Sequence, residues 1–161
     1  AAGVRTKMDE SDNSPGWKYA EYEMKGVPLR VEIGPKDMEK EQCVIARRDT
    51  GEKVFVPLAE LEETVKKLLD AVHDNMYAMA LKNREENTFD ITSPAEAKAV
   101  TSGKGGFLRS KWCGSLACEL AMKEQAGVSS RCMPLEQSGT EGVCPVCGKK
   151  CTTDIYWGVA Y

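Results

Sequence analysis

The chain has 161 residues, of which 42% are hydrophobic and 29% are charged, and its formal net charge is −3. This is the composition of an ordinary globular protein, long enough for one domain or two small ones. No run approaches the roughly 18–20 apolar residues of a membrane span, and the acidic balance argues against binding DNA or RNA by generic phosphate attraction.

The first ten residues contain no apolar signal region. The chain opens without an initiator Met and almost directly in a strand-like stretch, Val4–Met8, so we expect a piece of a longer protein. The seven cysteines are an odd number. Without a secretion signal, they favour metal binding or free thiols in a reducing compartment, for which we take the cytoplasm.

The N-terminal part predicts a mixture of helix and strands. Ser14 and Pro15 predict the start of a short helix over residues 16–25, which Gly26 would end. Residues 42–48 and 53–57 predict two strands joined by a turn at 49–52. Residues 28–34 alternate as a half-buried strand should, with Leu29, Val31 and Ile33 on an apolar face and Arg30 and Glu32 on a polar face.

A long helix follows, from about Pro57 to Glu86. Its apolar residues recur at steps of three and four: Leu58, Leu61, Val65, Leu68, Val72, Met76 and Met79. Such a stripe is compatible with a coiled coil, but we favour a helix packed along its own protein that joins two modules.

A second module is predicted after a boundary at residues 87–92. Ser93, Pro94 and Glu96 form a capping box that opens a short helix. A strand at 106–112, a helix at 115–125, and strands near 130–133 and 150–157 should follow. The predicted fold class is therefore α/β (α+β), in three parts: residues 1–58, a connecting helix at 59–90, and residues 91–161.

Four cysteines form two close pairs, Cys113 with Cys118 and Cys144 with Cys147. Zn²⁺ prefers four tetrahedral ligands in structural sites, and two such pairs supply them. The second pair stands in C-P-V-C-G, a sequence typical of a tight knuckle whose backbone N–H groups point at the sulfurs. Because four thiolates leave no open position, the predicted zinc is structural.

Three cysteines remain. Cys43 and Cys132 are expected to be small buried residues, and Cys151 is close enough in sequence to compete as a ligand. A thiol enzyme that uses Cys132 with the single histidine, His73, is an alternative, but the sequence shows no third group to orient the histidine.

Several segments together carry a family resemblance. They are WKYAEYEMKGVPLRVEIGPKD at residues 17–37, RRDTGEK at 47–53, WCGSLACE at 112–119, GVCPVCGK at 142–149 and the ending YWGVAY. In this order they resemble the C-terminal part of archaeal/eukaryotic-type prolyl-tRNA synthetases. The resemblance implies a truncated class IIa anticodon-binding α/β domain, a long connecting helix and a small zinc-binding α/β domain, and it covers essentially the whole chain.

The resemblance assigns anticodon recognition to five residues: Glu23, Arg30, Glu32, Lys36 and Asp37. Proline codons begin with CC, so the matching anticodon ends in GG. Guanine offers N–H donors, which suit carboxylates, and the acceptors O6 and N7, which suit Arg or Lys. Read from the residues alone, the same side chains could be an ordinary solvated strand face with ion pairs.

The remaining expectations also follow from the resemblance. The terminal carboxylate of Tyr161 would reach toward the active site of the family's catalytic domain, although a frayed terminus is the plain alternative. ATP and Mg²⁺ would belong to that domain, which is absent from the sequence, so the chain alone should be inactive. Expected partners are tRNA(Pro), the protein's own catalytic domain and a second copy in a homodimer. The competing interpretation is a free-standing zinc-ribbon module that binds protein without tRNA specificity.

Overall fold

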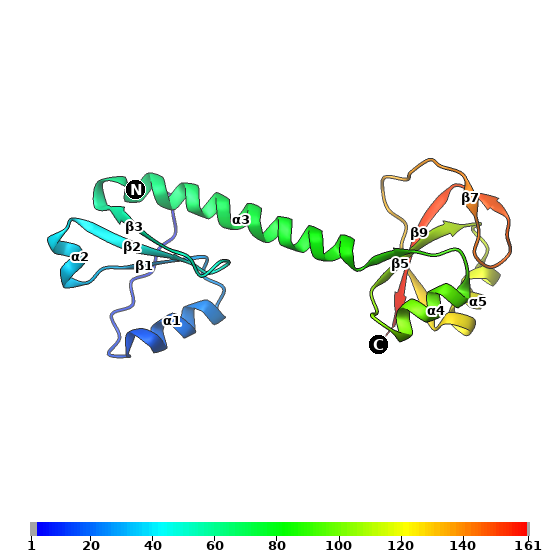
Figure 1. The fold of residues 1–161 in the computed structure, drawn as a ribbon, viewed down its shortest axis with the longest axis horizontal. Helices are drawn as coiled ribbons and strands as arrows, with labels where there is room; N and C mark the ends of the chain where they lie inside the picture. Colours follow the sequence, from blue (N-terminus) through cyan, green and yellow to red (C-terminus); the bar gives the residue numbers. More distant parts are fainter. Residues whose placement is uncertain (1–2, 161) are drawn as a thin grey trace. The chain divides into compact units, whose positions relative to one another are not determined.

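The computed structural model describes residues 3–160. The chain divides into two compact units, Ala1–Ala80 and Leu81–Tyr161. Each unit has its own sheet and its own hydrophobic core (Figure 1). The predicted α/β class is confirmed. Among the described helices, none is both long and apolar enough to cross a membrane.

The first unit is built on a three-stranded antiparallel sheet in the order β1-β2-β3. Ser14 caps the first helix by accepting a hydrogen bond from the Trp17 backbone N–H at 3.4 Å, as predicted. The elements are α1 (Pro15–Met24), β1 (Leu29–Glu32), α2 (Pro35–Glu39), β2 (Gln42–Arg47) and β3 (Lys53–Pro57).

The predicted hairpin is present between β2 and β3. The Gly51 N–H donates to the Arg47 carbonyl at 3.0 Å, and Gly51 has φ +73°. A residue with a Cβ is strained in this conformation, so glycine is the residue that the turn requires.

The predicted long helix is also present, as η1 (Leu58–Glu60) followed by α3 (Leu61–Glu86). Leu61, Val65 and Leu68 pack against the buried side chains of the sheet, Cys43, Ile45 and Val56. The stripe then leaves the core, because Met76 is 44% and Met79 is 58% exposed. The middle of the apolar stripe is therefore the part that packs on its own unit: Leu61, Val65 and Leu68 lie against the sheet core and Val72 is 3% exposed, whereas Leu58 at the start is 42% exposed.

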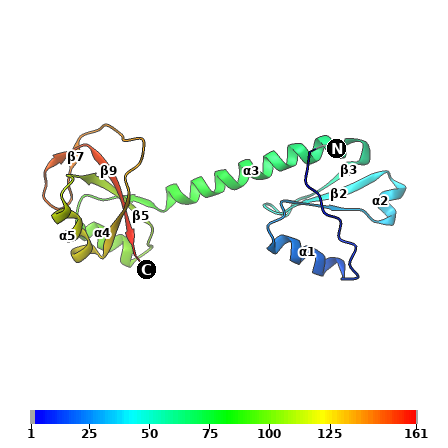
Figure 2. The ribbon, with the colours of Figure 1, turned by 180° about the vertical axis from the view of Figure 1, so that it is seen from behind.

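Two expectations for the first unit are wrong. Val4–Met8 forms no strand, because an extended segment becomes a strand only by pairing and this one joins none of the three strands. Figure 2 shows this segment running past the sheet as an irregular stretch. The predicted apolar face of residues 28–34 is not buried as expected: Val31 of β1 and Ile33 just after it are 44% and 53% exposed, and of the three apolar residues Leu29 is the one that packs on the core.

The second unit has a four-stranded sheet in the order β4-β5-β9-β6 and a small two-stranded sheet, β7-β8. In the larger sheet β4 is parallel to β5, and the other pairs are antiparallel. Helices α4 and α5 contact each other, and both contribute to the core over this sheet. The elements are β4 (Thr88–Asp90), α4 (Pro94–Ser102), β5 (Phe107–Trp112), α5 (Leu116–Ala126), β6 (Val128–Cys132), β7 (Gly142–Val143), β8 (Lys150–Cys151) and β9 (Thr153–Val159).

The core of the second unit centres on Trp157, which is fully buried and donates its indole N–H to the hydroxyl of Ser110 at 2.9 Å. A buried indole usually finds such a partner. Around it pack residues from both helices, from three strands and from the segment after β4: Ile91, Ala97, Leu108, Met122, Ala126, Val128 and Ile155.

The capping box at the start of α4 is present in modified form. The Ser93 hydroxyl accepts from the Glu96 N–H at 3.2 Å, as predicted, whereas the Glu96 carboxylate takes the N–H of Thr92 at 2.7 Å. The stretch that we predicted as a boundary contains strand β4. The predicted strand at 130–133 begins earlier, at Val128, because Gly127, with φ +69°, ends α5 immediately before it.

Candidate functional sites

Five side chains of the first unit form a connected polar cluster, which we call the Arg30 cluster: Tyr19, Glu23, Arg30, Glu32 and Lys53. Helix α1 supplies the first two. Arg30 and Glu32 lie two residues apart on β1 and so share one face of the sheet. Ala46 of β2 is paired with both Arg30 and Lys53, which puts Lys53 on that same face.

Arg30 is the centre of the cluster. Its Nη1 donates to Glu23 Oε1 at 2.6 Å and its Nε to Glu32 Oε1 at 2.9 Å. Its guanidinium carbon lies 3.8 Å from the centroid of the Tyr19 ring. Lys53 Nζ donates to Glu32 Oε2 at 3.1 Å. The polar face predicted from alternation is thus a network of neighbouring cations and carboxylates.

The network shifts the pKa values of Glu32 and Arg30 so that both groups keep their charge. Partial burial would raise the pKa of Glu32, but hydrogen bonds from Arg30 and Lys53 outweigh it and hold the pKa below its usual value. Burial would lower the pKa of Arg30, and its bonds to Glu23 and Glu32 raise it instead. Both groups therefore stay charged near neutral pH and can supply charged acceptors and donors to a ligand.

The other two predicted recognition residues lie on α2, outside this network. Asp37 closes the start of α2, where it accepts from the Gly34 N–H at 3.0 Å, and its second oxygen accepts from Gln42 Nε2 at 3.2 Å. The hydrogen bond from the Gly34 N–H and, to a smaller extent, the one from Gln42 lower the pKa of Asp37. Lys36 is exposed on the same helix. Among residues 3–160, no hydrogen bond or ion pair joins Lys36 or Asp37 to the Arg30 cluster.

A second polar group ties the hairpin to the long helix. Arg47 donates to both carboxylate oxygens of Asp49, at 3.1 and 2.7 Å, and Asn75 of α3 donates to Asp49 at 2.8 Å. The Asp49 side chain is 1% exposed. The hydrogen bonds from Arg47 lower the pKa of Asp49 to about 2. This group is an anchor for the β2–β3 turn, which the sequence did not indicate.

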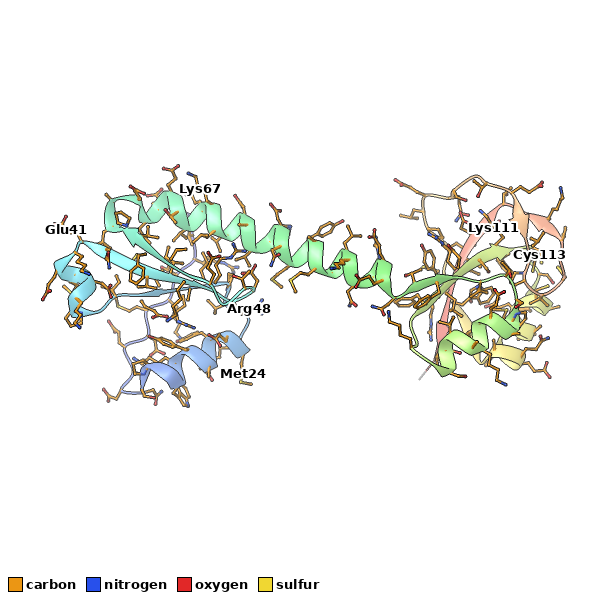
Figure 3. All side chains as sticks on the ribbon, in the orientation of Figure 1. Met24, Glu41, Arg48, Lys67, Lys111 and Cys113 are labelled. Carbon is orange, nitrogen blue, oxygen red and sulfur yellow. The ribbon has the colours of Figure 1, made fainter. Side chains whose placement is uncertain are left out.

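The four predicted cysteine ligands come together in the second unit. Cys113 follows β5 (Figure 3), Cys118 lies in the first turn of α5, and Cys144 and Cys147 flank a tight turn after β7. Their sulfur atoms all lie within 4.8 Å of one another. The Cys113 Sγ is 3.6 Å from that of Cys118 and 3.7 Å from that of Cys147. These four residues could hold a metal ion.

The distances provide a test of fit. Ligand sulfurs at 2.3 Å from a tetrahedrally coordinated ion lie about 3.8 Å from each other. The two observed separations agree with this value, and they are far longer than the roughly 2.0 Å of a disulfide. The donor set consists only of sulfur atoms, which soft and borderline metals prefer.

The turn around Cys144 is prepared for a thiolate. Burial would raise the pKa of Cys144, but backbone N–H groups of Cys147, Val146 and Cys113 point at its sulfur and lower the pKa to about 7. The Gly148 N–H closes the turn on the Cys144 carbonyl at 2.9 Å, and Gly148 has φ +70°. The knuckle predicted from C-P-V-C-G is present.

Within residues 3–160, the remaining three cysteines belong to no metal-binding group. Cys43 is fully buried in the core of the first unit, as predicted, and burial raises its pKa. Cys132 is exposed, so the expectation that it is buried is wrong. Cys151 is half-buried in β8 and is not one of the four clustered cysteines.

The thiol-enzyme alternative gains no support. His73 is exposed on α3 and belongs to the first unit, whereas Cys132 belongs to the second. Tyr161, to whose terminal carboxylate the family resemblance gave a role, lies outside the described residues.

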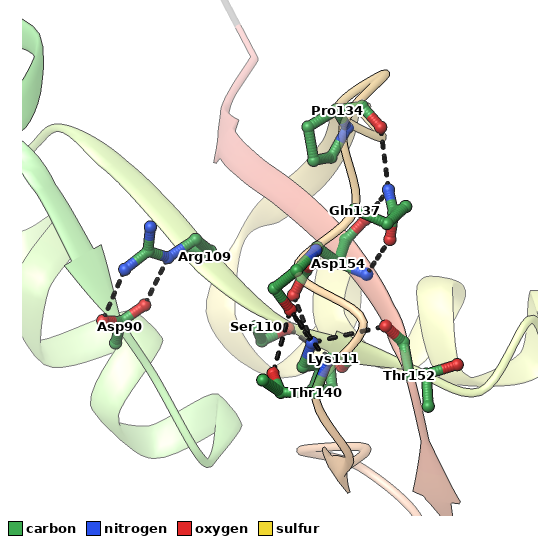
Figure 4. A network of polar contacts seen from close by, with 10 residues as sticks. Asp90, Arg109, Ser110, Lys111, Pro134, Gln137, Thr140, Thr152 and Asp154 are labelled. Atoms are coloured by element: carbon green, nitrogen blue, oxygen red, sulfur yellow. Dashed lines mark hydrogen bonds and ion pairs between the residues drawn. The ribbon is translucent and has the colours of Figure 1, made fainter.

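A groove of about 740 Å³ borders β4, β5 and β9 in the second unit and was not predicted. Figure 4 shows the polar network along it. Lys111 pairs with Asp154 at 2.5 Å and donates to Ser138 Oγ at 2.6 Å, while Arg109 and Asp90 form a two-pronged ion pair at 2.6 and 2.8 Å. Asp154 also accepts from the Ser138 N–H at 2.7 Å. The network ties the loop at residues 134–140 to the sheet.

Comparison with known proteins identifies both units. Residues 1–68 match the family model "Anticodon binding domain", and residues 94–161 match "Prolyl-tRNA synthetase, C-terminal". The Arg30 cluster falls within the first match, and the four clustered cysteines fall within the second.

Curated relatives match nearly the whole chain. "Proline--tRNA ligase 2" of Bacillus thuringiensis (strain Al Hakam) is 50% identical over 98% of this chain and 33% of its own length. "Proline--tRNA ligase" of Clostridium botulinum (strain Loch Maree / Type A3) is 51% identical with the same coverage. The chain thus spans about a third of the length of these relatives.

A solved structure has the same fold. The crystal structure of prolyl-tRNA synthetase from Cryptosporidium parvum, complexed with L-proline and AMP, matches 99% of this chain and 34% of its own. The TM-score is 0.90 and the sequence identity 31%.

Proposed function

Because the chain belongs to the prolyl-tRNA synthetase family and corresponds to its C-terminal part, we propose that its first unit recognises the GG of the tRNA(Pro) anticodon. The observation that carries this proposal is the Arg30 cluster, because it sets a guanidinium beside two carboxylates on one face of an anticodon-binding domain.

The chemistry of the cluster suits guanine. The Watson–Crick edge of guanine offers the acceptor O6 beside the donors N1–H and N2–H. Arg30 can donate to O6, while Glu23, whose side chain is 53% exposed, has a second carboxylate oxygen for the N–H donors. Adenine has a donor, its N6 amino group, in place of O6 and an acceptor, N1, in place of N1–H. Arg30 and Glu23 would therefore meet groups of like character and repel them.

Glu32, Lys36 and Asp37 complete the proposed recognition set. Glu32 fixes Arg30 through its 2.9 Å hydrogen bond. Lys36 carries an exposed cation suited to a base acceptor or a phosphate. Asp37 already accepts two hydrogen bonds, so its first effect is to fix α2 on which Lys36 lies.

For the second unit we propose a structural Zn²⁺ held by Cys113, Cys118, Cys144 and Cys147. The all-sulfur donor set and the 3.6 and 3.7 Å sulfur separations, which agree with tetrahedral coordination, support this metal. The ion would cross-link the loop after β5 to the turn after β7. Since all four positions would be filled by thiolates, it would activate no water.

The family also suggests the setting in which these units act. We propose that the complete enzyme attaches proline to tRNA(Pro) with ATP and Mg²⁺ bound in a catalytic domain outside these 161 residues. We further propose that it acts in the cytoplasm and as a homodimer. On this proposal the present chain supplies tRNA recognition and no catalytic residue.

Binding to anticodon stem–loop RNA tests the recognition proposal. Replacing one G of the GG by A should weaken binding by about 1–3 kcal/mol, the usual cost of a wrong base at a specific contact. Arg30→Ala should remove most of this preference, whereas Lys67→Ala, which removes an exposed cation on α3 away from the cluster, should not. Equal binding of the GG loop and an unrelated loop would instead favour a zinc-ribbon module that binds protein.

A further inference from the structure

We propose that Tyr19 is a positioning residue that holds Arg30 in the orientation needed to bind guanine, an inference that rests on the proposed anticodon recognition. Tyr19 is half-buried on α1, and its ring lies 3.8 Å from the guanidinium carbon of Arg30. A cation at this distance from a ring face is attracted by the ring quadrupole. The ring thereby fixes the plane of the guanidinium.

Two carboxylates fix the remaining freedom within that plane. Glu23 holds Nη1 at 2.6 Å and Glu32 holds Nε at 2.9 Å. Lys53 supports the second of these by its own bond to Glu32 at 3.1 Å, and its Nζ lies 5.8 Å from the centroid of the same Tyr19 ring. The Arg30 side chain is only 20% exposed. A long, flexible side chain is therefore ordered before any ligand arrives, which removes part of the cost of binding.

Part of the hydrogen-bonding capacity of Arg30 remains for a ligand. A guanidinium has five N–H donors. Among residues 3–160, Nη1 and Nε take one carboxylate oxygen each, and Nη2 has no hydrogen-bond partner. An Arg with a free Nη2 beside Nη1 can bind guanine acceptors through the end of its fork. Tyr19 thus stabilises Arg30 by contact with its guanidinium, and Lys53 does so through Glu32, without using Nη2. Neither residue was singled out from the sequence.

The test is the ratio of two affinities measured with the full 161-residue chain. The probes are an anticodon stem–loop RNA that ends in GG and the same RNA with one G replaced by A. Tyr19→Leu removes the ring face and should reduce the ratio by about 3- to 10-fold. Tyr19→Phe keeps the ring face and should preserve the ratio within about 2-fold. Tyr77→Leu, which replaces a 66% exposed tyrosine of α3, is the matched control and should leave it unchanged.

The ratio separates positioning from stability. A variant that is only partly folded loses the same factor of affinity for both RNAs, so its ratio stays at the wild-type value. If Tyr19→Leu does not fold, Tyr19→Met gives the same readout, since it keeps apolar bulk for the packing of α1 but has no π face.

The outcomes for this inference and for the proposed function are distinct. If Arg30→Ala leaves the ratio unchanged, recognition by the cluster is refuted and the positioning role falls with it. If Arg30→Ala instead brings the affinity ratio down to 1 while Tyr19→Leu or Tyr19→Met keeps the wild-type ratio, only the positioning role is overturned. A Tyr19→Phe variant that behaves like Tyr19→Leu also overturns it, because the ring face would then not be the feature that matters.

Discussion

Removal of one thiolate by Cys144→Ser should abolish tight zinc binding and destabilise the second unit alone. Cys144 is 2% exposed, and its sulfur receives three backbone N–H groups, so it is the ligand whose site is most completely formed by the chain itself. A metal that binds only the folded state stabilises it by about 2.7 kcal/mol when its concentration is 100 times the dissociation constant. For a unit of this size that corresponds to a shift in Tm of roughly 10–20 °C.

The two units allow the effect to be localised. The core of the second unit contains Trp157, and Trp112 packs against it, whereas Trp17 lies in the first unit. Thermal unfolding followed by near-ultraviolet circular dichroism, with and without a strong chelator, should show loss of the second unit at lower temperature. The first unit, whose core is formed by residues such as Cys43 and Ile45, should unfold as before.

Elemental analysis gives the stoichiometry. We expect one zinc per wild-type chain and a large loss in Cys144→Ser. Cys132→Ser and Cys151→Ser are the controls, because neither residue is among the four clustered cysteines. The ligand assignment is wrong if Cys144→Ser keeps both its zinc and its Tm, or if Cys151→Ser loses the metal instead.

Two further changes probe the second unit. The Lys111 hydrogen bond lowers the pKa of Asp154 to about 2, so this carboxylate stabilises the fold above its unfolded pKa of about 3.9 and loses that effect as the pH falls toward 2. Asp154→Asn should therefore have a lower Tm than wild type near neutral pH, and the difference should shrink below about pH 4; a constant difference would contradict the ion-pair explanation. Leu108→Ala, at a fully buried position, should cost about 2–5 kcal/mol in urea unfolding of the second unit. Leu135→Ala, at a fully exposed one, should stay within about 0.5 kcal/mol, and equal effects would show that the core is misplaced.

Local chemistry made much of the fold predictable. Ser14, Ser93 and Gly51 act through hydrogen bonds or backbone conformations that involve only near neighbours in sequence, so their motifs indicate the right helix starts and the right turn. Whether an extended segment forms a strand depends on a neighbouring strand to pair with, which the local sequence does not specify. Val4–Met8 has the composition of a strand but pairs with neither edge of the β1-β2-β3 sheet, and Val31 is exposed although its alternation predicts burial.

The candidate sites were predictable to different extents for the same reason. The cysteine spacings contain nearly all of the information that a tetrathiolate site needs, so Cys113, Cys118, Cys144 and Cys147 were predicted together and lie together. The resemblance to the family supplied Arg30 and its carboxylates. Tyr19 was missed because its contact with Arg30 depends on how α1 packs on the sheet, which no short pattern encodes. An aromatic residue one helical turn before Glu23 was the only signal available.

The self-pairing of the Arg30 cluster explains how an acidic chain could be suited to RNA. An unpaired Arg30 would attract any phosphate, and non-specific binding of that kind grows with the number of free cations. Here Arg30 and Lys53 are neutralised by Glu23 and Glu32, so the face has little net charge and offers few sites for phosphates in general. The hydrogen-bonding groups that remain for a ligand have fixed directions. They are the donors on Arg30 Nη2 and the second carboxylate oxygen of Glu23, and the Tyr19 ring already orders them. A base with the complementary edge can use that geometry without first ordering it, whereas a phosphate gains little from it. Selectivity for a base over the backbone then follows from the pairing itself, and it does not require a basic protein.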